Sequence, residues 1–451
     1  MSASRNIWGV SAPRRARLPF RTKLLYSFSS LGGEALSYSR GLWLLYYYDK
    51  EVGLSVVLIG ALLVAGRVIE AFDDALIGYW SDRTRSRWGR RIPFVLGATP
   101  LWALFGLLIF TPPHSGDVGT AVYLFVTLEL FFLFSTLSGG PYEALLPEIA
   151  PRSADRVAIA GIRVYVGAAG AGVGLAGSDV LKDAFGFQAM ALAMAALALV
   201  ARYVGLAGVW RLARRSREPA EISLRDALRA TFSNSQFLFF LPSFVFFQIG
   251  IQMLLGDLPY YVDAVLPEGS WVGEGVLAGV ALGAAIAAVP AFAVLAQRRS
   301  KREAFSRAML AAGLLFPLFA VAGLLPGIPD EPEILVAMAI LGAPIAGIYL
   351  FPAVLTADII DYDATRTGLR REATYYGAQN FVEKLATSLA PGVLALVLLL
   401  GRTAENPTGV RVVGPVAGTI VLAGWLVFRR YELPDEVEAE VEAEPVALAP
   451  P

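Results

Sequence analysis

Cysteine is absent from this chain of 451 residues, and histidine occurs once, at His114. A chain without cysteine has no disulfides, zinc–thiolate sites or iron–sulfur clusters. We interpret His114, which lies between two apolar runs, as a solvated loop residue and not as a proton relay. The sequence contains no G-x-x-x-x-G-K-[ST] motif and no visible nucleophile–base pair, which argues against an ATP-driven pump and against an enzyme. No cofactor is expected.

Charged residues are also scarce. They make up 17% of the chain, whereas hydrophobic residues make up 56% and the mean hydropathy is +0.58. Soluble domains contain about 25% charged residues, so the composition predicts an all-α membrane protein that crosses the bilayer many times. The 38 basic and 38 acidic residues cancel. We expect a lipid bilayer and a small solute as partners, and no nucleic acid.

Two sets of six apolar runs are long enough to span a bilayer, which takes about 20 residues. They lie at about 24–48, 54–80, 92–112, 120–141, 157–181 and 186–209, and at about 236–263, 272–296, 304–326, 333–356, 373–400 and 410–428. The only long connector between them is polar and Arg-rich. The sequence therefore predicts an N-terminal six-helix bundle (1–209), a cytoplasmic linker (210–235), a C-terminal six-helix bundle (236–430) and a disordered acidic tail (431–451).

Loop charges predict the orientation. Basic residues follow the second, sixth, eighth and tenth spans, whereas the loops at 111–119, 265–274 and 326–333 contain no Lys or Arg. The positive-inside rule then places both termini in the cytoplasm, in a plasma (inner) membrane. No small-residue cleavage site follows the basic N-terminus, so we interpret it as a cytoplasmic lead-in and not as a removed signal.

The second apolar run is interrupted by four ionisable side chains: Arg67, Glu70, Asp73 and Asp74. A charge at bilayer depth costs about 2.5–3.5 kcal/mol on insertion scales, so it is retained mainly where it binds or moves something. Arg67, Glu70 and Asp74 share one face of a helix, because residues three and four apart are neighbours. This pattern predicts an ion site that faces a water-filled cavity, and hence transport.

The eleventh run carries a polar stripe at helical spacing: Tyr376, Asn380, Glu383, Lys384 and Thr387. A buried lysine needs a counter-charge, which acidic groups of the second run are able to supply. A bound cation and the fixed ammonium of Lys384 would then compete for the same carboxylates.

Polar groups of other runs add to the expected cavity. Glu34 shares a helix face with Ser30 and Tyr38, which favours a cavity role over a structural salt bridge with Arg40. Arg163 either donates two parallel hydrogen bonds to a hydroxylated or anionic substrate or snorkels to the cytoplasmic surface.

Two further motifs each allow two interpretations. The segment 172–177 matches G-x-G-x-x-G, but it lies inside an apolar run and not after a strand, which favours close helix packing over a nucleotide site. Asp82, Arg83, Arg90 and Arg91 follow the second run. Such charges are able to latch the cytoplasmic face in one conformation, or they only set the topology.

Three blocks carry a family resemblance. They are 46–55 leading into Arg67, Glu70 and Asp74 and closing at 84–89; the segment 141–147 (PYEALLP); and 357–362 (ADIIDY) leading to Lys384. Over residues 22–430 the chain resembles the glycoside–pentoside–hexuronide:cation symporters, the melibiose permease-like branch of the major facilitator superfamily. The resemblance implies the major facilitator fold, with twelve transmembrane helices in two six-helix bundles.

The resemblance also implies roles for individual residues. Glu70, Asp74 and Thr136 match cation-site positions, and the two carboxylates are metal ligands only if the ion is Na⁺. Glu34, Arg163, Tyr349 and Asn380 match substrate-contacting positions, and Lys384 matches the eleventh-helix lysine; Arg67 and Asp73 are expected as further charge partners. The sequence departs from the family at Gly139, where a sugar-gripping acid is typical, and at Glu143, which replaces an aromatic residue.

These observations predict a monomeric secondary transporter that couples a sugar or glycoside to Na⁺ or H⁺ by alternating access. One alternative is a cation-coupled carrier of lysophospholipids or other amphiphiles with the same fold, which requires a cavity open sideways to the bilayer. A second alternative is a non-transporting receptor or scaffold, in which the charged residues pair only structurally.

Overall fold

A computed structural model describes residues 17–66, 69–70, 84, 86, 88–89, 91–113, 116–150, 152–213, 234–267, 269–367, 375, 378–379, 382–384 and 388–433. Within these residues the regular structure is helical, apart from one isolated β-bridge between Thr403 and Asn406. This agrees with the all-α prediction. The predicted linker 210–235 and the tail after residue 433 lie mostly outside the described residues.

The described helices of the N-terminal half are α1 (Phe20–Tyr46), η1 (Tyr47–Glu51), α3 (Ile92–Leu108), α4 (Gly116–Glu143), α5 (Leu146–Ile149), α6 (Ser153–Gly172), η2 (Val173–Gly177) and α7 (Ser178–Ala213). Helix α7 is interrupted at Gly186, whose φ of +84° is in the left-handed region that favours glycine. This break separates the predicted fifth and sixth spans.

The described helices of the C-terminal half are α9 (Ser235–Val265), α10 (Glu274–Arg298), α11 (Lys301–Leu315), α12 (Leu318–Val321), α13 (Asp330–Gly342), η3 (Ala343–Ile345), α14 (Ala346–Thr367), α16 (Leu389–Leu398) and α17 (Thr408–Phe428). The tenth apolar run ends at about residue 356, whereas helix α14 continues to Thr367. Polar residues there end the apolar run but not the backbone hydrogen bonding.

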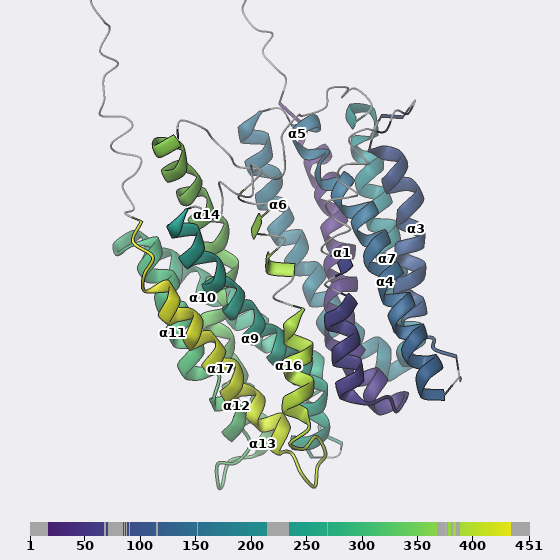
Figure 1. Ribbon diagram of the computed structural model, residues 1–451, viewed down its shortest axis with the longest axis vertical. Helices are drawn as coiled ribbons and strands as arrows, with labels where there is room; N and C mark the ends of the chain where they lie inside the picture. The colour runs from purple at the N-terminus through teal and green to yellow at the C-terminus, as the bar shows by residue number, and fades with distance from the viewer. Residues whose placement is uncertain are drawn as a thin grey trace, which may run out of the picture.

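The helices form two groups, which lie side by side in Figure 1. Helix α1 packs on α6 and α7, and α3 packs on α4; in the second group α9 packs on α16 and α17, and α10 packs on α13. Contacts between the groups come mainly from α1 with α9 and from η2 with α10. The arrangement is that of a major facilitator fold.

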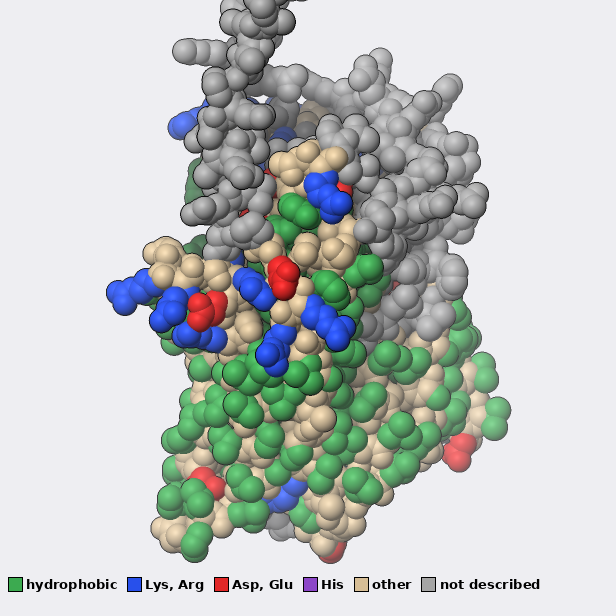
Figure 2. All heavy atoms as spheres, turned by 60° about the vertical axis from the view of Figure 1, so that its left-hand side comes forward, with side chains coloured by type: hydrophobic (Ala, Val, Ile, Leu, Met, Phe, Trp, Pro, Cys, Tyr) green, Lys and Arg blue, Asp and Glu red, His purple; other side chains and the backbone are tan. Residues whose placement is uncertain are grey.

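The apolar surface fits a bilayer. Seven helical stretches of the described residues are long and apolar enough to cross a membrane: Gly116–Glu143, Ala158–Leu212, Ser235–Val265, Glu274–Arg298, Lys301–Val321, Asp330–Arg366 and Thr408–Phe428. Figure 2 shows a broad band of hydrophobic side chains below a group of basic side chains. The predicted second and eleventh spans lie partly outside the described residues, so twelve spans remain a prediction.

Glycines allow α1 to pack closely on α6 and η2. A Cβ added at Gly170 would lie 2.3 Å from the carbonyl oxygen of Leu31, and one added at Gly174 would lie 2.5 Å from that of Ala35. Only glycine permits backbones to approach this closely. The G-x-G-x-x-G match is therefore a helix-packing feature, as predicted.

Gly170→Ala is expected to destabilise the fold by about 1–3 kcal/mol, because overpacking forces the two helices apart. Gly172 is a matched control, since a Cβ there meets no atom within 4 Å. Heating the purified variants in detergent and measuring the remaining monodisperse protein tests this. Equal melting of Gly170→Ala and Gly172→Ala would contradict the packing assignment.

Candidate functional site

A polar cavity of about 430 Å³ lies between the two groups of helices. Helices α1 and α4 contribute one wall and helices α9 and α16 contribute the other, together with residues of the predicted second and eleventh spans. Its polar and charged lining residues are Glu34, Ser37, Tyr38, Arg40, Glu70, Ser135, Gln248, Gln252, Glu383, Lys384 and Ser388. The cavity is therefore suited to a hydroxylated or charged solute.

Glu70 and Lys384 meet in this cavity. The Nζ atom of Lys384 lies 3.4 Å from Oε1 of Glu70, and the two side chains are 34% and 5% exposed. The sequence places these residues on the second and eleventh spans, so the contact joins the two halves of the chain. The structure thus brings together the lysine and one of the acids that were expected to neutralise it. Arg67, Asp73 and Asp74 lie outside the described residues.

Glu34 faces the same cavity. Its side chain is exposed on α1 and lines the cavity wall. The alternative salt bridge with Arg40 is not formed, because residues six apart point to different sides of a helix. The Arg40 guanidinium instead lies over the rings of Phe131 and Phe132, at 5.4 and 5.2 Å from their centroids. Glu34 is thus available to a solute.

Two amides of the cavity were not predicted from the sequence, and one of them contacts Glu383 of the predicted polar stripe. Glu383 Oε1 accepts a hydrogen bond of 2.8 Å from Nε2 of Gln248, and Gln252 lines the cavity one turn further along α9. The sequence does contain a pattern that indicates these two amides: Gln248 and Gln252 are four residues apart in an apolar run, so they share one face of a helix. Together they give the C-terminal wall hydrogen-bonding groups that suit a polyol.

Arg163 on α6 is not among the residues that line the cavity. Its Nη2 atom is 2.8 Å from Oε1 of Glu143, and its Nε donates to Oγ of Ser30 at 3.2 Å. Both partners belong to the N-terminal group of helices, and Ser30 lies one turn before Glu34 on α1. The carboxylate of Glu143, which stands where the family has an aromatic residue, thus holds Arg163 near Glu34.

Two other predicted residues have different surroundings. The hydroxyl of Tyr349 on α14 lies 3.2 Å from that of Tyr38 on α1, so this hydrogen bond joins the two groups of helices. Thr136 is buried at 8% exposure, and its neighbour Ser135 lines the cavity. Asn380 lies outside the described residues.

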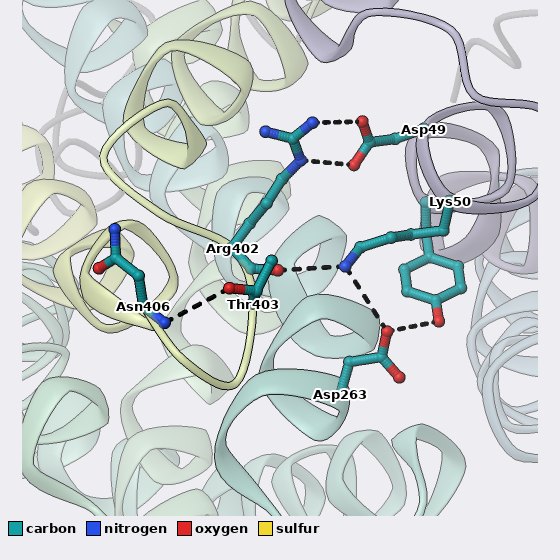
Figure 3. Close-up of polar contacts among 7 residues, drawn as sticks. Asp49, Lys50, Asp263, Arg402, Thr403 and Asn406 are labelled. Carbon is teal, nitrogen blue, oxygen red and sulfur yellow. Dashed lines mark hydrogen bonds and ion pairs between the residues drawn. The ribbon is translucent and has the colours of Figure 1, made fainter.

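An ionic cluster joins the two groups of helices at the end where α1 finishes (Figure 3). Arg402 donates two hydrogen bonds to Asp49, at 2.7 and 2.9 Å. Lys50 donates to the carbonyl oxygen of Arg402 at 3.1 Å and lies 3.9 Å from Asp263, which also accepts a hydrogen bond from Tyr46 at 2.7 Å. We call these residues the α1-end cluster.

Electrostatics favour this pairing strongly. The Asp49 side chain is 2% exposed, and the hydrogen bonds from Arg402 raise the pKa of that guanidinium above its ordinary value. A two-pronged arginine–carboxylate pair is among the stronger polar contacts in proteins. The α1-end cluster therefore holds the two groups of helices together at this end.

A second cluster joins the groups at the start of α10. Asp179 on α7 accepts a hydrogen bond of 2.9 Å from the backbone N–H of Gly275, which is in the first turn of α10. Lys182 lies 3.6 Å from Asp179 and 3.7 Å from Glu274. A carboxylate at a helix N-terminus is favourable because the backbone N–H groups there point outward. The two clusters close one end of the interface.

The expected latch residues are mostly outside the described residues: Asp82, Arg83 and Arg90. Arg91 is described, and its Nη1 lies 2.7 Å from Oε1 of Glu148 on α5. It also donates to the carbonyl oxygen of Ala144. Both of these contacts lie within the N-terminal group of helices.

Comparisons with known proteins agree with this architecture. The family described as MFS/sugar transport protein matches residues 25–409. A protein of Synechocystis sp. named as an uncharacterized symporter is 24% identical, over 85% of this chain and 86% of its own length. The isoprimeverose transporter of Lactiplantibacillus pentosus is 25% identical, over 88% and 84%. The solved structure of the nucleoside transporter NupG is 14% identical with a TM-score of 0.64, over 91% and 98%, which shows the shared fold.

Proposed function

The chain belongs to the MFS/sugar transport protein family, in its branch of cation symporters. On that premise we propose that it carries a sugar or glycoside across the membrane together with Na⁺ or H⁺. The single observation that supports this best is the contact between Glu70 and Lys384 in a polar cavity between the two groups of helices. The carrier alternates between states in which the cavity opens to one side or the other.

The coupling we propose is an exchange of partners. In the absence of the cation, the ammonium of Lys384 neutralises Glu70, whose side chain is 5% exposed. An entering cation binds Glu70 together with Asp74 and takes the place of Lys384 at Glu70, because both positive groups use the same carboxylate oxygens and repel each other there. A sodium ion needs about six oxygen ligands, for which Thr136 and backbone carbonyls are candidates, whereas a proton needs one carboxylate.

The substrate, we propose, lies between Glu34 on one wall and Gln248 and Glu383 on the other. These groups belong to different halves of the chain and line one cavity. Carboxylate and amide groups suit the hydroxyls of a sugar, since each accepts or donates hydrogen bonds. Arg163, which is held by Ser30 and Glu143 near Glu34, supports this site. Tyr349 and Asn380 are further proposed contacts of the substrate.

Under this proposal the structure represents the state of the carrier that is closed to the outside. If the protein lies in the plasma (inner) membrane with both termini in the cytoplasm, the α1-end cluster lies on the outer side. The second cluster, which consists of Asp179, Lys182 and Glu274, lies on the same side. Both clusters join the two groups of helices, which supports a state closed to the outside. We further propose that a single chain is the functional unit, because the cavity is lined by one chain.

Uptake into proteoliposomes tests the proposal. Labelled xylosides, glucosides and galactosides are offered under an imposed Na⁺ or H⁺ gradient, and accumulation under one of the gradients is the expected result. Gradient-driven movement of a lysophospholipid without any sugar would favour the amphiphile carrier. Binding without movement of either would favour a receptor.

Glu34→Gln is expected to weaken sugar binding by about 10- to 100-fold, because a hydrogen bond to a charged group contributes about 1.5–3 kcal/mol. Cation binding should be unchanged, since Glu34 does not contact Glu70 or Lys384 within the described contacts. Calorimetry with sugar and with cation measures both. The exposed Glu432, which does not line the cavity, provides the control variant Glu432→Gln. Unaltered sugar affinity in Glu34→Gln would remove Glu34 from the substrate site.

A further inference from the structure

A second, apolar cavity of about 90 Å³ adjoins the polar one. It shares Tyr38 and Leu255 with the polar cavity and extends from there between α9, α10 and α13. Leu254, Leu277, Met338 and Leu341 are among its lining residues. We call it the apolar lobe, and the 430 Å³ cavity the polar lobe.

The apolar lobe offers almost no hydrogen-bonding side chains. Among its lining residues only Tyr38 and Tyr349 carry a polar atom, and their hydroxyls are hydrogen-bonded to each other at 3.2 Å. A sugar ring placed here would leave several hydroxyls without partners, and each costs about 1–3 kcal/mol by mutational measures. The apolar lobe therefore excludes the sugar that the polar lobe suits.

The size of the lobe limits what it holds. An apolar cavity of about 150 Å³ takes a benzene molecule, and the apolar lobe is smaller than that. It accommodates a short alkyl group but not the long acyl chain of a lipid. The two lobes share Tyr38 and Leu255 as lining residues, so a solute held by Glu34 and Gln248 in the polar lobe lies next to the apolar lobe.

We propose that the substrate is a glycoside with a short apolar aglycone, whose sugar occupies the polar lobe and whose aglycone occupies the apolar lobe. This inference rests on the proposed function and narrows it to a substrate class. Free sugars and methyl glycosides then use only the polar lobe and bind more weakly.

Calorimetry on the purified full chain tests the inference with methyl and n-butyl glycosides of xylose, glucose and galactose in both anomers. For the sugar that binds, the three added methylene groups are expected to tighten binding by at least about tenfold. Equal affinities for the methyl and n-butyl compounds in the unaltered protein would overturn the inference.

Variants locate the gain in the apolar lobe. Ala281 lines the lobe on α10, and Ala281→Leu fills it, so this variant should bind n-butyl and methyl glycosides with equal affinity. Ala287 lies on the same helix, exposed and outside both lobes, so Ala287→Leu should keep the advantage. An advantage that survives in Ala281→Leu would place the aglycone elsewhere and overturn the inference.

A complementary variant enlarges the lobe and remains informative if Ala281→Leu does not fold. Leu254→Ala should shift the preference from n-butyl to n-hexyl glycosides by a similar factor, and an unchanged preference would contradict the inference. Transport assays distinguish failure of the aglycone assignment from failure of the proposed function. If methyl glycosides are carried but n-butyl glycosides bind no better, only the aglycone assignment fails. If no glycoside binds or is carried, the proposed function fails with it.

Discussion

Glu70→Gln is expected to abolish cation-driven accumulation of the substrate. Glu70 is almost completely buried and lies 3.4 Å from the ammonium of Lys384. Glutamine at this position takes one of the two proposed carboxylate ligands away from the cation, and the hydrogen bonds that a charged group makes contribute about 1.5–3 kcal/mol each. The initial rate of gradient-driven uptake should therefore fall by about 100-fold or more. Proteoliposomes with an imposed Na⁺ or H⁺ gradient measure it.

The same variant distinguishes the two candidate ions. Glutamine resembles a protonated glutamate in shape and charge, so Glu70→Gln should retain sugar exchange without a gradient if the coupling ion is H⁺. If the ion is Na⁺, exchange should also fall, because an amide replaces a charged ligand. Glu432→Gln is the control and should behave like the unaltered protein, since Glu432 is exposed and does not line the cavity. Normal accumulation by Glu70→Gln would contradict the coupling scheme.

Arg402→Ala is expected to open the outer end of the carrier. The change leaves the Asp49 carboxylate, which is 2% exposed, without its two-pronged partner. Such a loss costs about 3–5 kcal/mol in a buried pair. Part of this cost falls on the outward-closed state alone, so the equilibrium constant should shift toward the outward-open state by about 10- to 100-fold. Uptake should fall as well, since the inward-open state is then less populated.

The absence of cysteine makes this prediction easy to measure. A single Ser37→Cys change places one thiol in the cavity wall, and no other cysteine competes for the label. An impermeant thiol reagent added outside should react about 10- to 100-fold faster in the Arg402→Ala background. Arg307→Ala is the control, because Arg307 pairs within α11 with Glu303. The exchanged pair Asp49→Arg with Arg402→Asp should restore slow labelling, and labelling that does not change in Arg402→Ala would contradict the role of the cluster.

Helical spacing and bilayer depth were enough to predict much of this architecture. The charges in the second run and the lysine in the eleventh run indicated facing helices, and the structure has Glu70 and Lys384 in contact. The same reasoning placed Glu34 on the cavity face of α1. Depth in the membrane is informative because an isolated charge there is so unfavourable that it restricts the possible partners.

Other features could not be predicted from local pattern. Asp49 and Arg402 lie 353 residues apart at the ends of helices, where charge is ordinary, so nothing in the sequence marks them as a pair. Arg91 is one of the charges that either latch the cytoplasmic face or only set the topology, and nothing in the sequence indicated its ion pair with Glu148 on α5. The glycines of α6 and η2 indicated close packing, whereas only the structure identifies α1 as the partner.

Simultaneous measurement of substrate and cation flux in proteoliposomes tests the central claim most directly. With the unaltered protein, labelled substrate and Na⁺ or H⁺ should enter together in a fixed ratio, and Glu70→Gln should remove the cation flux. Cation entry that does not depend on the substrate, or that persists unchanged in Glu70→Gln, would contradict the account.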